Sequence, residues 1–286
     1  MQITFTDVSA DYVVGPIRNE NVLHSINLTI KPGTITAIIG HTGAGKTSLL
    51  RCMNGLLLPK TGQIQVGKYQ ITPHIDQRQT LNKIRQHVGM VFQFPESQLF
   101  AETVEKDICF GPLNFGVSLT EAQKRAKQTL QLVGLNQDIL QQSPFSLSGG
   151  QKRRVAIAGV LATNPKVLIL DEPGAGLDPD GKQTIYTLLT RLNREAGMTI
   201  ILVTHDMNDV AQYADEAIVM QNGQVVSQTG VRELFSLNKQ LEEWHLDLPD
   251  ALRFQKRIER ETGANLPYPC LTVDELADAL IKAGLV

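Results

Sequence analysis

The octapeptide that begins at Gly40, Gly-His-Thr-Gly-Ala-Gly-Lys-Thr, constrains the fold more than any other feature of this sequence. It matches the pattern Gly-x-x-x-x-Gly-Lys-Thr/Ser and stands between an apolar run, residues 34–39, and a helical pattern, residues 47–54. Glycines in such a loop let backbone N–H groups curl around phosphate oxygens, and the helix that follows presents its positive end. The sequence therefore predicts a phosphate-binding loop between a buried strand and a helix.

Individual side chains of this loop have separate expected tasks. Lys46 is expected to reach the β- and γ-phosphates of ATP, and the hydroxyl of Thr47 to bind Mg²⁺. The alternative, a glycine-rich turn without a ligand, is disfavoured by the flanking strand and the Lys-Thr pair. We expect contacts to ATP from Gly40, His41, Thr42, Gly43, Ala44, Gly45, Lys46, Thr47 and Ser48.

A pair of carboxylates, Asp171 and Glu172, follows the apolar run at residues 167–170. Carboxylates at the carboxyl end of a buried strand lie beside the phosphate loop in an open α/β sheet. Asp171 then suits Mg²⁺ binding, and Glu172 suits the general base, because hydrolysis needs an acceptor beside an attacking water. A plain turn is the alternative for this segment taken alone.

A second anion cradle is expected where Ser148, Gly149, Gly150 and Gln151 open a helix. One chain has no obvious need for two such cradles. Two copies arranged head to tail would use both, because the loop of one chain and the Ser-Gly-Gly of the other would sandwich each ATP. The alternative is a helix start that is merely capped by a serine.

The remaining pattern predicts an α/β protein. Apolar runs at residues 167–170 and 199–203, with a helix at 180–195 between them, are typical of a largely parallel sheet covered on both faces. Residues 96–162 are mainly helical in pattern, and the helix at 119–132 places on one face Ala122, Ala126, Leu130 and Val133.

A small helical appendage is expected beyond about residue 230. Thr272 and Glu275 fit a capping box that opens its last helix. The helix before it, residues 250–261, presents on one face Ala251, Phe254 and Ile258.

With these motifs in this order, residues 1–230 resemble the ATP-binding cassette family. The resemblance implies a P-loop nucleotide-binding domain with a mostly parallel core sheet, an antiparallel β subdomain and a helical subdomain at about residues 96–162. The segment at 231–286 is then a small C-terminal helical extension that serves in dimerisation.

The resemblance also implies roles for single residues. Tyr12 would stack on adenine, and Asp178 would lie in the nucleotide-contacting loop after the acidic pair. Gln93 and His205 would join Glu172 in catalysis. Gln93 would sense the phosphate and Mg²⁺, and His205 would stabilise charge on the γ-phosphate.

Two segments of the sequence point to one particular group within this family. Residues 92–100 and 145–154 are similar to those of ATPase subunits of energy-coupling factor transporters, second ATPase type. The implied partners are a second ATPase subunit, in a heterodimer rather than a homodimer, a transmembrane scaffold (T component) and, indirectly, a substrate-binding S component. The implied task is vitamin or micronutrient uptake by a peripheral subunit at the cytoplasmic face of the cell membrane. Gly174 departs from the family, which usually has threonine there.

The apolar residues Phe94, Leu99 and Phe100 are candidates for a groove that receives a coupling helix of the scaffold. Their alternative is ordinary packing where the core meets the helical region.

Composition and charge limit the other classes of function. With 27 Lys+Arg against 29 Asp+Glu the net charge is −2, which leaves no basic excess for nucleic acid. The three cysteines are far apart, which favours a reduced, cytosolic setting, and neither a signal peptide nor a run of ~18 apolar residues is visible.

Three alternative functions stay open. One is the ATPase of a dedicated cobalt or nickel importer. A second is a soluble cassette protein acting on DNA or ribosomes, although the single phosphate loop and the lack of a heptad run argue against it. The third is a regulatory module without turnover, against which Glu172 and His205 argue.

Overall fold

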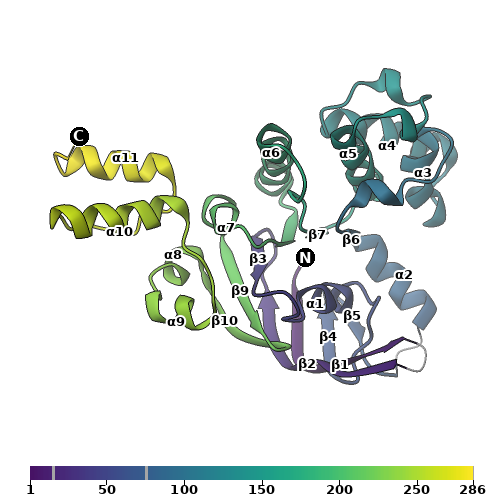
Figure 1. The fold of residues 1–286 in the computed structure, drawn as a ribbon. Helices are drawn as coiled ribbons and strands as arrows, with labels where there is room; N and C mark the ends of the chain where they lie inside the picture. Colours follow the sequence, from purple (N-terminus) through teal and green to yellow (C-terminus); the bar gives the residue numbers. More distant parts are fainter. Residues whose placement is uncertain (15–16, 75–76, 286) are drawn as a thin grey trace.

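In the part of the chain that the computed structural model describes, residues 1–14, 17–74 and 77–285, six strands form the central sheet (Figure 1). Their order is β10-β9-β3-β8-β7-β6, with parallel pairing from β9 through β6 and antiparallel pairing of β10 with β9. The bounds are β3 Ile35–Ile39, β6 Val88–Val91, β7 Val167–Asp171, β8 Thr199–Val203, β9 Glu216–Gln221 and β10 Gln224–Gly230. The predicted parallel sheet is confirmed.

A second, antiparallel sheet lies beside the first, in the order β2-β1-β4-β5. Its strands are β1 Ile3–Val14, β2 Ile17–Ile30, β4 Thr61–Val66 and β5 Tyr69–Ile71. Helix α1, Lys46–Met53, buries Leu49, Leu50 and Met53 in one apolar cluster with residues of both sheets. The helix that follows the phosphate loop is therefore fixed between the two sheets.

Helices cover the other face of the central sheet. Helix α6, Pro179–Ala196, and helix α7, Met207–Tyr213, bury their apolar side chains in a cluster with β3, β7 and β8. Because both faces are covered, every residue of these three strands is buried. The helix predicted at 180–195 is present, one residue longer at each end.

The region between β6 and β7 is helical, as predicted (Figure 1). The four residues predicted to share one face of the helix at 119–132 are all buried, namely Ala122, Ala126, Leu130 and, directly after the end of the helix, Val133. The elements are the 3-10 turn η1 Pro95–Gln98, α3 Val104–Asn114, α4 Leu119–Leu132, the 3-10 turns η2 Gln137–Ile139 and η3 Pro144–Ser146, and α5 Gly149–Leu161.

Helix α2, Gln77–His87, is absent from the sequence prediction. Its buried residues Leu81 and Ile84 stand alone among glutamines and charged side chains, so the segment has little apolar periodicity. Both pack into the cluster around α1. Tertiary packing rather than local pattern therefore determines this helix.

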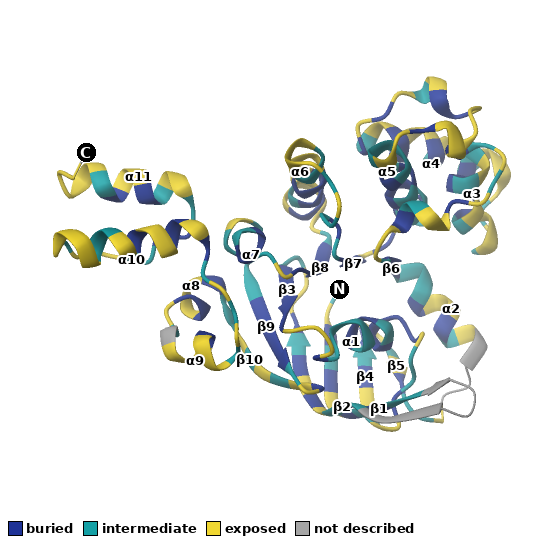
Figure 2. Ribbon diagram, viewed as in Figure 1, coloured by how far each residue is buried: buried dark blue, intermediate teal, exposed yellow. Residues whose placement is uncertain are grey.

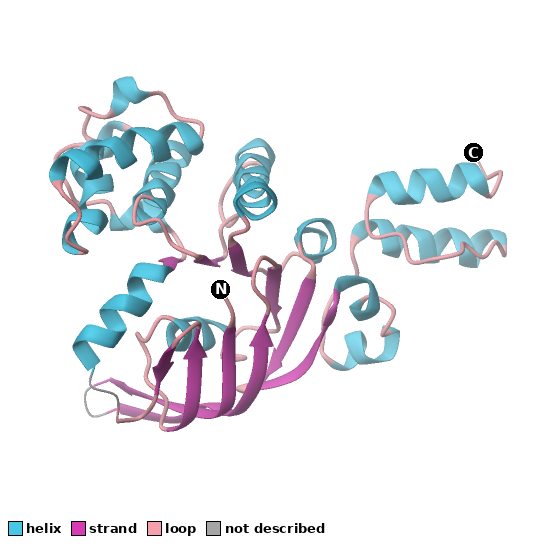
Figure 3. Cartoon of the chain, turned by 180° about the vertical axis from the view of Figure 1, so that it is seen from behind, coloured by secondary structure: helices cyan, strands magenta, loops and turns pink. Residues whose placement is uncertain are grey.

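The chain ends in four helices. They are α8 Val231–Leu234, α9 Asn238–Glu243, α10 Asp250–Thr262 and α11 Val273–Lys282. Helices α8 and α9 pack on the main core through Val231, Leu234 and Leu241. Helices α10 and α11 form a hairpin that projects from the rest of the molecule and is largely exposed (Figures 1 to 3). No helix in the described ranges is long and apolar enough to cross a membrane.

The buried face of α10 differs from the predicted one. Ala251 is buried, but the other buried positions are Leu252 and Gln255, whereas Phe254 is 54% exposed. Leu252 packs on the main core, and the amide of Gln255 bonds to the backbone of the α10–α11 connection at Cys270 (2.7 Å). The buried face of α10 is therefore determined by contacts with the main core and with the α10–α11 connection, and not by packing against α11 alone.

The predicted capping box at the start of α11 is half formed. Thr272 Oγ1 accepts from the backbone N–H of Glu275, as expected. The carboxylate of Glu275 accepts from the N–H of Leu271 (2.9 Å), one residue earlier than the box requires, and it also pairs with Arg232.

Candidate nucleotide site

The site is built where neighbouring parallel strands end. Strand β3 leads into the loop at Gly40, and β7 ends at Asp171. Strand β8 is followed by His205, and β6 by Gln93. Because the carboxyl ends of parallel strands meet at one edge of the sheet, these segments converge although they are far apart in sequence.

A cavity of about 640 Å³ lies at this edge, within the size range of small-molecule sites. Its lining confirms that the phosphate loop, the acidic pair and Gln93 are neighbours in space. The lining residues are Val22, Thr42, Gly43, Gly45, Lys46, Thr47, Ser48, Gln93, Asp171, Glu172, Val203, Asn222 and Gly223.

Two glycines of the loop are required by its backbone path. Gly40 has φ 143°, and a Cβ there would stand 2.2 Å from the carbonyl oxygen of Met220 on the neighbouring strand β9. Gly45 has φ 99°, and a Cβ would stand 3.0 Å from the carbonyl oxygen of Val22. Neither position accepts another residue without movement of the backbone.

Lys46 folds back onto its own loop. Its Nζ donates to the carbonyl oxygens of Gly40 (2.7 Å) and His41 (2.9 Å). Burial lowers the pKa of Lys46 below its ordinary value, although the carboxylates of Glu172 and Asp171 act in the opposite direction. The ammonium group thus lies at the centre of the loop.

The turn between β9 and β10 supports the phosphate loop. Asn222 and Gly223 both have positive φ, 48° and 76°, as in the tightest hairpin turns. The N–H of Gly223 donates to the carbonyl oxygen of Ala44 (3.0 Å). Asn-Gly between two strand-like segments is a hairpin signal, so the turn could have been found in the sequence, but its place in the site could not.

Thr47 and Asp171 are in direct contact. Thr47 Oγ1 donates to Asp171 Oδ2 at 3.0 Å. Burial raises the pKa of Asp171 above its ordinary value, and the charge of Glu172 adds to the shift, while the hydrogen bond from Thr47 opposes it. Two acids side by side in a partly buried site would be stabilised by a cation.

Glu172 adopts a backbone conformation that is uncommon for its residue type. Its φ is 51°, and its N–H donates to the carbonyl oxygen of Val203 (3.0 Å). This conformation turns the side chain toward His205, whose Nδ1 lies 3.2 Å from Glu172 Oε1. His205 is itself 75% exposed at the rim.

Several predicted site residues lie outside the cavity of their own chain. Ser148 and Gln151 form a reciprocal capping box at the start of α5, with Ser148 Oγ accepting at 3.3 Å and Gln151 Oε1 at 3.0 Å. Asp178 caps α6 through the N–H of Gly181 (3.1 Å). Tyr12 lies under the guanidinium of Arg51, 5.4 Å from its ring centre.

Gly174 lies in the loop after the acidic pair. A Cβ there would stand 3.2 Å from Lys182 Cγ and 3.3 Å from the ring of Tyr186. The glycine leaves room for Lys182 to pair with Asp206 (2.6 Å) and Asp209 (2.7 Å), in the segment that follows His205. This substitution therefore affects packing at the base of that loop and leaves the phosphate loop untouched.

The fold and the site together define a P-loop ATPase of the cassette type. The sequence model of the family described as "ABC transporter" matches residues 23–175. Over nearly the whole chain, 51% of residues are identical to the "Energy-coupling factor transporter ATP-binding protein EcfA2" of Enterococcus faecalis, with 99% of this chain and 97% of that protein covered. The protein of the same name from Latilactobacillus sakei is 53% identical, with 98% and 96% covered.

Solved structures agree with these relatives. The chain is similar to cbiO1 of Clostridium perfringens, part of the ABC transporter complex cbiONQ, with a TM-score of 0.73, 36% identity, and 92% of this chain and 98% of that chain covered. It is also similar to the dimeric ATP-binding cassette MJ0796 bound to ADP and Pi, with a TM-score of 0.71, 31% identity, and 80% and 99% covered. The chain belongs to the ABC transporter family and, within it, to the EcfA2 group of energy-coupling factor transporter ATP-binding proteins. It is an ATP-binding, ATP-hydrolysing transporter subunit.

Proposed function

We propose that the chain powers an energy-coupling factor importer by closing on ATP together with a second cassette. The observation that carries this proposal is the location of residues 148–151, which form a helix start and do not line the cavity of their own chain. Ser148 and Gly149 are exposed, and Gly150 and Gln151 are half-buried. In the proposal, residues 1–230 are the cassette, with a helical subdomain at about 96–162, and residues 231–286 are an extension used in pairing.

The residues of the cavity would hold a nucleotide with its metal. Lys46 would bind the β- and γ-phosphates, and the backbone N–H groups of residues 40–48 would surround them. Thr47, Asp171 and Gln93 offer the oxygen ligands that Mg²⁺ prefers, and the contact between Thr47 and Asp171 already brings two of them together. When bound, Mg²⁺ would neutralise charge on the phosphates.

Hydrolysis would use the contact between Glu172 and His205. Glu172 would accept a proton from the attacking water, and His205, which touches Oε1 of Glu172, would stabilise charge on the γ-phosphate. The partner's copies of Ser148, Gly149, Gly150, Gln151 and Asp178 would complete each site, and Tyr12 would stack on adenine. Loss of the γ-phosphate removes contacts that bridge the two cassettes, so the open state is again favoured.

The composite site can be tested by separating binding from pairing. In Gly150→Asp a carboxylate stands where the partner's phosphates would lie, so ATP-driven pairing should be lost. ATP binding by the single chain should stay within about twofold, since Gly150 does not line its own cavity. Equilibrium binding of a fluorescent ATP analogue measures ATP binding by the single chain. Size-exclusion chromatography with Mg-ATP measures pairing, and for this measurement both the parent chain and the Gly150→Asp variant also carry Glu172→Gln.

The control for this test is Leu119→Asp. It adds the same charge to an exposed helix start of the same region, 58% exposed, and should leave pairing intact. Loss of ATP binding by the single Gly150→Asp chain would contradict the composite site.

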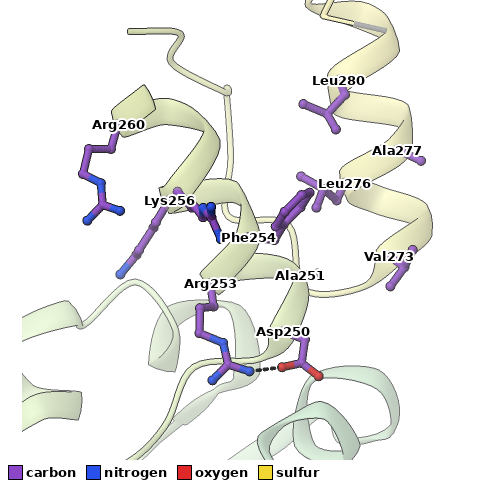
Figure 4. A pocket seen from close by; sticks show the side chains of 11 residues that line it. Asp250, Ala251, Arg253, Phe254, Lys256, Arg260, Val273, Leu276, Ala277 and Leu280 are labelled. Atoms are coloured by element: carbon purple, nitrogen blue, oxygen red, sulfur yellow. Dashed lines mark hydrogen bonds and ion pairs between the residues drawn. The ribbon is translucent and has the colours of Figure 1, made fainter. Parts of the chain in front are cut away.

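The α10–α11 hairpin supports pairing with a different ATPase. Between the two helices lies a cavity of about 830 Å³ that combines apolar side chains, Phe254 and Leu276 among them, with the α10 cations Arg253, Lys256, Arg257 and Arg260 (Figure 4). It has no glycine loop or pair of adjacent carboxylates, so it is no second nucleotide site. Asp250 pairs with Arg253 and Glu261 with Arg257, which reduces this charge, but the lining still carries more cations than carboxylates. In a symmetric homodimer the same patch would face itself and bring the excess cations together, which favours a heterodimer.

The membrane partner would bind at a second cleft. A cavity of about 380 Å³ lies between the core and the helical region, and Leu99 and Phe100 line it together with Leu56, Phe92 and Phe110. The third predicted residue, Phe94, is 49% exposed but does not line it. Phe100 and Phe110 pack edge to face, with ring centres 4.8 Å apart. We infer that this cleft receives a helix of the T component.

That location would make the chain a peripheral subunit at the cytoplasmic face of the membrane, with the S component contacted indirectly. Vitamins or related micronutrients are the proposed cargo. The importer proposal is favoured over a dedicated cobalt or nickel importer because the relatives at about 50% identity carry the energy-coupling factor name, against 36% for cbiO1.

Phe110→Glu tests the cleft. A carboxylate in this apolar lining should prevent docking of the scaffold, so co-purification and ATP-driven uptake should fall about tenfold or more. ATP binding by the isolated chain should not change. Leu113→Glu, on the same helix and 41% exposed but outside the lining, is the matched control. Equal loss of uptake in both variants would exclude the cleft as the docking site.

A further inference from the structure

One buried arginine, Arg153, connects three segments by hydrogen bonds, and the proposed function gives each of these segments a different task. Arg153 lies on α5, two residues after Gln151, and is 3% exposed. Its Nε and one terminal nitrogen donate to the two carboxylate oxygens of Glu96, each at 3.0 Å. Its other terminal nitrogen donates to the carbonyl oxygens of Pro173 (3.1 Å) and Ala175 (2.6 Å).

The three segments are functionally distinct in the proposed scheme. Helix α5 begins at Ser148, which would contact the partner's ATP. Glu96 lies in η1, whose Pro95 and Gln98 line the apolar cleft. Pro173 follows Glu172 directly, and Ala175 comes two residues after Pro173. The N–H of Ala175 closes a turn onto the carbonyl oxygen of Glu172 (3.1 Å).

The chemistry of the guanidinium makes this link stiff. A planar fork that binds a carboxylate at two points fixes both distance and orientation, unlike a lysine ammonium. A buried arginine that lost these partners would leave an uncompensated charge, so the four contacts favour one arrangement. Burial of Glu96 raises its pKa, but the hydrogen bonds from Arg153 and from the backbone outweigh this and leave the pKa below its ordinary value. The carboxylate therefore remains charged near neutral pH.

We propose that Arg153 is a positioning residue, which holds the Glu172 turn in place and ties it to the cleft segment through Glu96. A shift of η1 when the cleft is occupied then moves the turn that carries Glu172, and the start of α5 moves with it. The inference rests on the proposed function because it takes the cleft as the docking surface of the membrane scaffold. It adds a physical route between that surface and the hydrolysis site.

The test uses the assembled transporter and, in parallel, the pair of ATPase subunits alone. Arg153→Lys keeps the charge but loses the fork, so kcat for ATP should fall about tenfold or more in both assemblies while KM stays within about twofold. Glu96→Gln keeps the two carbonyl contacts and breaks the ion pair. It should retain at least about half of the kcat of the pair alone, yet lower the substrate moved per ATP in the transporter about fivefold or more.

The double variant and a control complete the design. Because both residues act through one link, Glu96→Gln with Arg153→Lys should lower kcat no further than Arg153→Lys alone. Glu121→Gln breaks another ion pair of the helical region, with Arg125 on α4 at 3.0 Å, and should change neither quantity. Thermal unfolding midpoints of all variants identify losses that come from instability.

The outcomes separate the inference from the function on which it rests. An unchanged kcat in Arg153→Lys would overturn the positioning role. The role would also be overturned if the losses of kcat paralleled the decrease in the thermal unfolding midpoint and if the losses of the two single variants added up in the double variant. Unchanged transport per ATP in Glu96→Gln would overturn the link to the cleft. A wild-type complex without ATP-driven transport would refute the proposed function instead, and the kcat of the ATPase pair would still report on Arg153.

Discussion

Glu172→Gln should lower ATP hydrolysis by about 10²- to 10⁴-fold, the range of a lost general base, while ATP binding stays intact. The amide keeps the shape of the side chain but accepts a proton poorly. The backbone at φ 51° and the N–H contact to Val203 do not depend on the carboxylate, so the turn should keep its form. Phosphate release under single-turnover conditions measures hydrolysis, and equilibrium binding of an ATP analogue measures affinity.

A further consequence makes this variant informative. If hydrolysis reopens the closed pair, the variant should accumulate as an ATP-bound pair that size-exclusion chromatography detects. Asp180→Asn, which removes an exposed carboxylate at the start of α6, serves as the control and should hydrolyse ATP at the normal rate. Retained turnover in Glu172→Gln would remove Glu172 from the role of base and leave His205 as the polar group that acts at the γ-phosphate.

Gly40→Ala should destabilise the protein by about 2–6 kcal/mol and abolish ATP binding. The new Cβ would stand 2.2 Å from the carbonyl oxygen of Met220, which belongs to the sheet and has little freedom to move. The φ of 143° adds a backbone cost. Steric overlap of this kind costs about 1–3 kcal/mol, and a strained backbone about as much again. Denaturant unfolding without nucleotide measures the loss.

Gly43→Ala is the matched control for that experiment. Gly43 also has a positive φ, 84°, but no atom lies within 4 Å of the position of a Cβ. Its cost should be the backbone part, about 1 kcal/mol. Equal losses in the two variants would show that contact with Met220 is unimportant and that backbone conformation alone governs the loop.

Much of the fold follows from local signals in the sequence. The runs at β3, β7 and β8 are apolar throughout because both faces of these strands are buried, and the four apolar residues on one face of α4 recur with the period of a helix. By contrast, α2 offers two buried residues among polar ones, and α10 is oriented by a buried glutamine that bonds to a distant backbone. Such elements depend on contacts that no window of sequence contains.

In the candidate site, too, some features could be predicted from local sequence and others depend on contacts between residues far apart in the chain. Residues 40–48 and the acidic pair could be predicted because each motif is continuous in sequence and follows a strand. The Asn222-Gly223 turn beneath Ala44 and the link from Arg153 to Glu96 join residues far apart along the chain. Neither residue type nor spacing indicated these contacts, and a charged side chain such as Arg153 is usually expected at the surface.

The resting position of Lys46 has a consequence for how the nucleotide enters. Its ammonium is half-buried and already donates to two carbonyl oxygens of the loop, so part of its dehydration is completed during folding. In the proposed function, an arriving triphosphate would therefore exchange one set of oxygen partners for another around a cation that is already in place. In that scheme the two hydrogen bonds would hold the ammonium group within the loop before the phosphates arrive, so that the ligand would meet a positive charge that is already positioned.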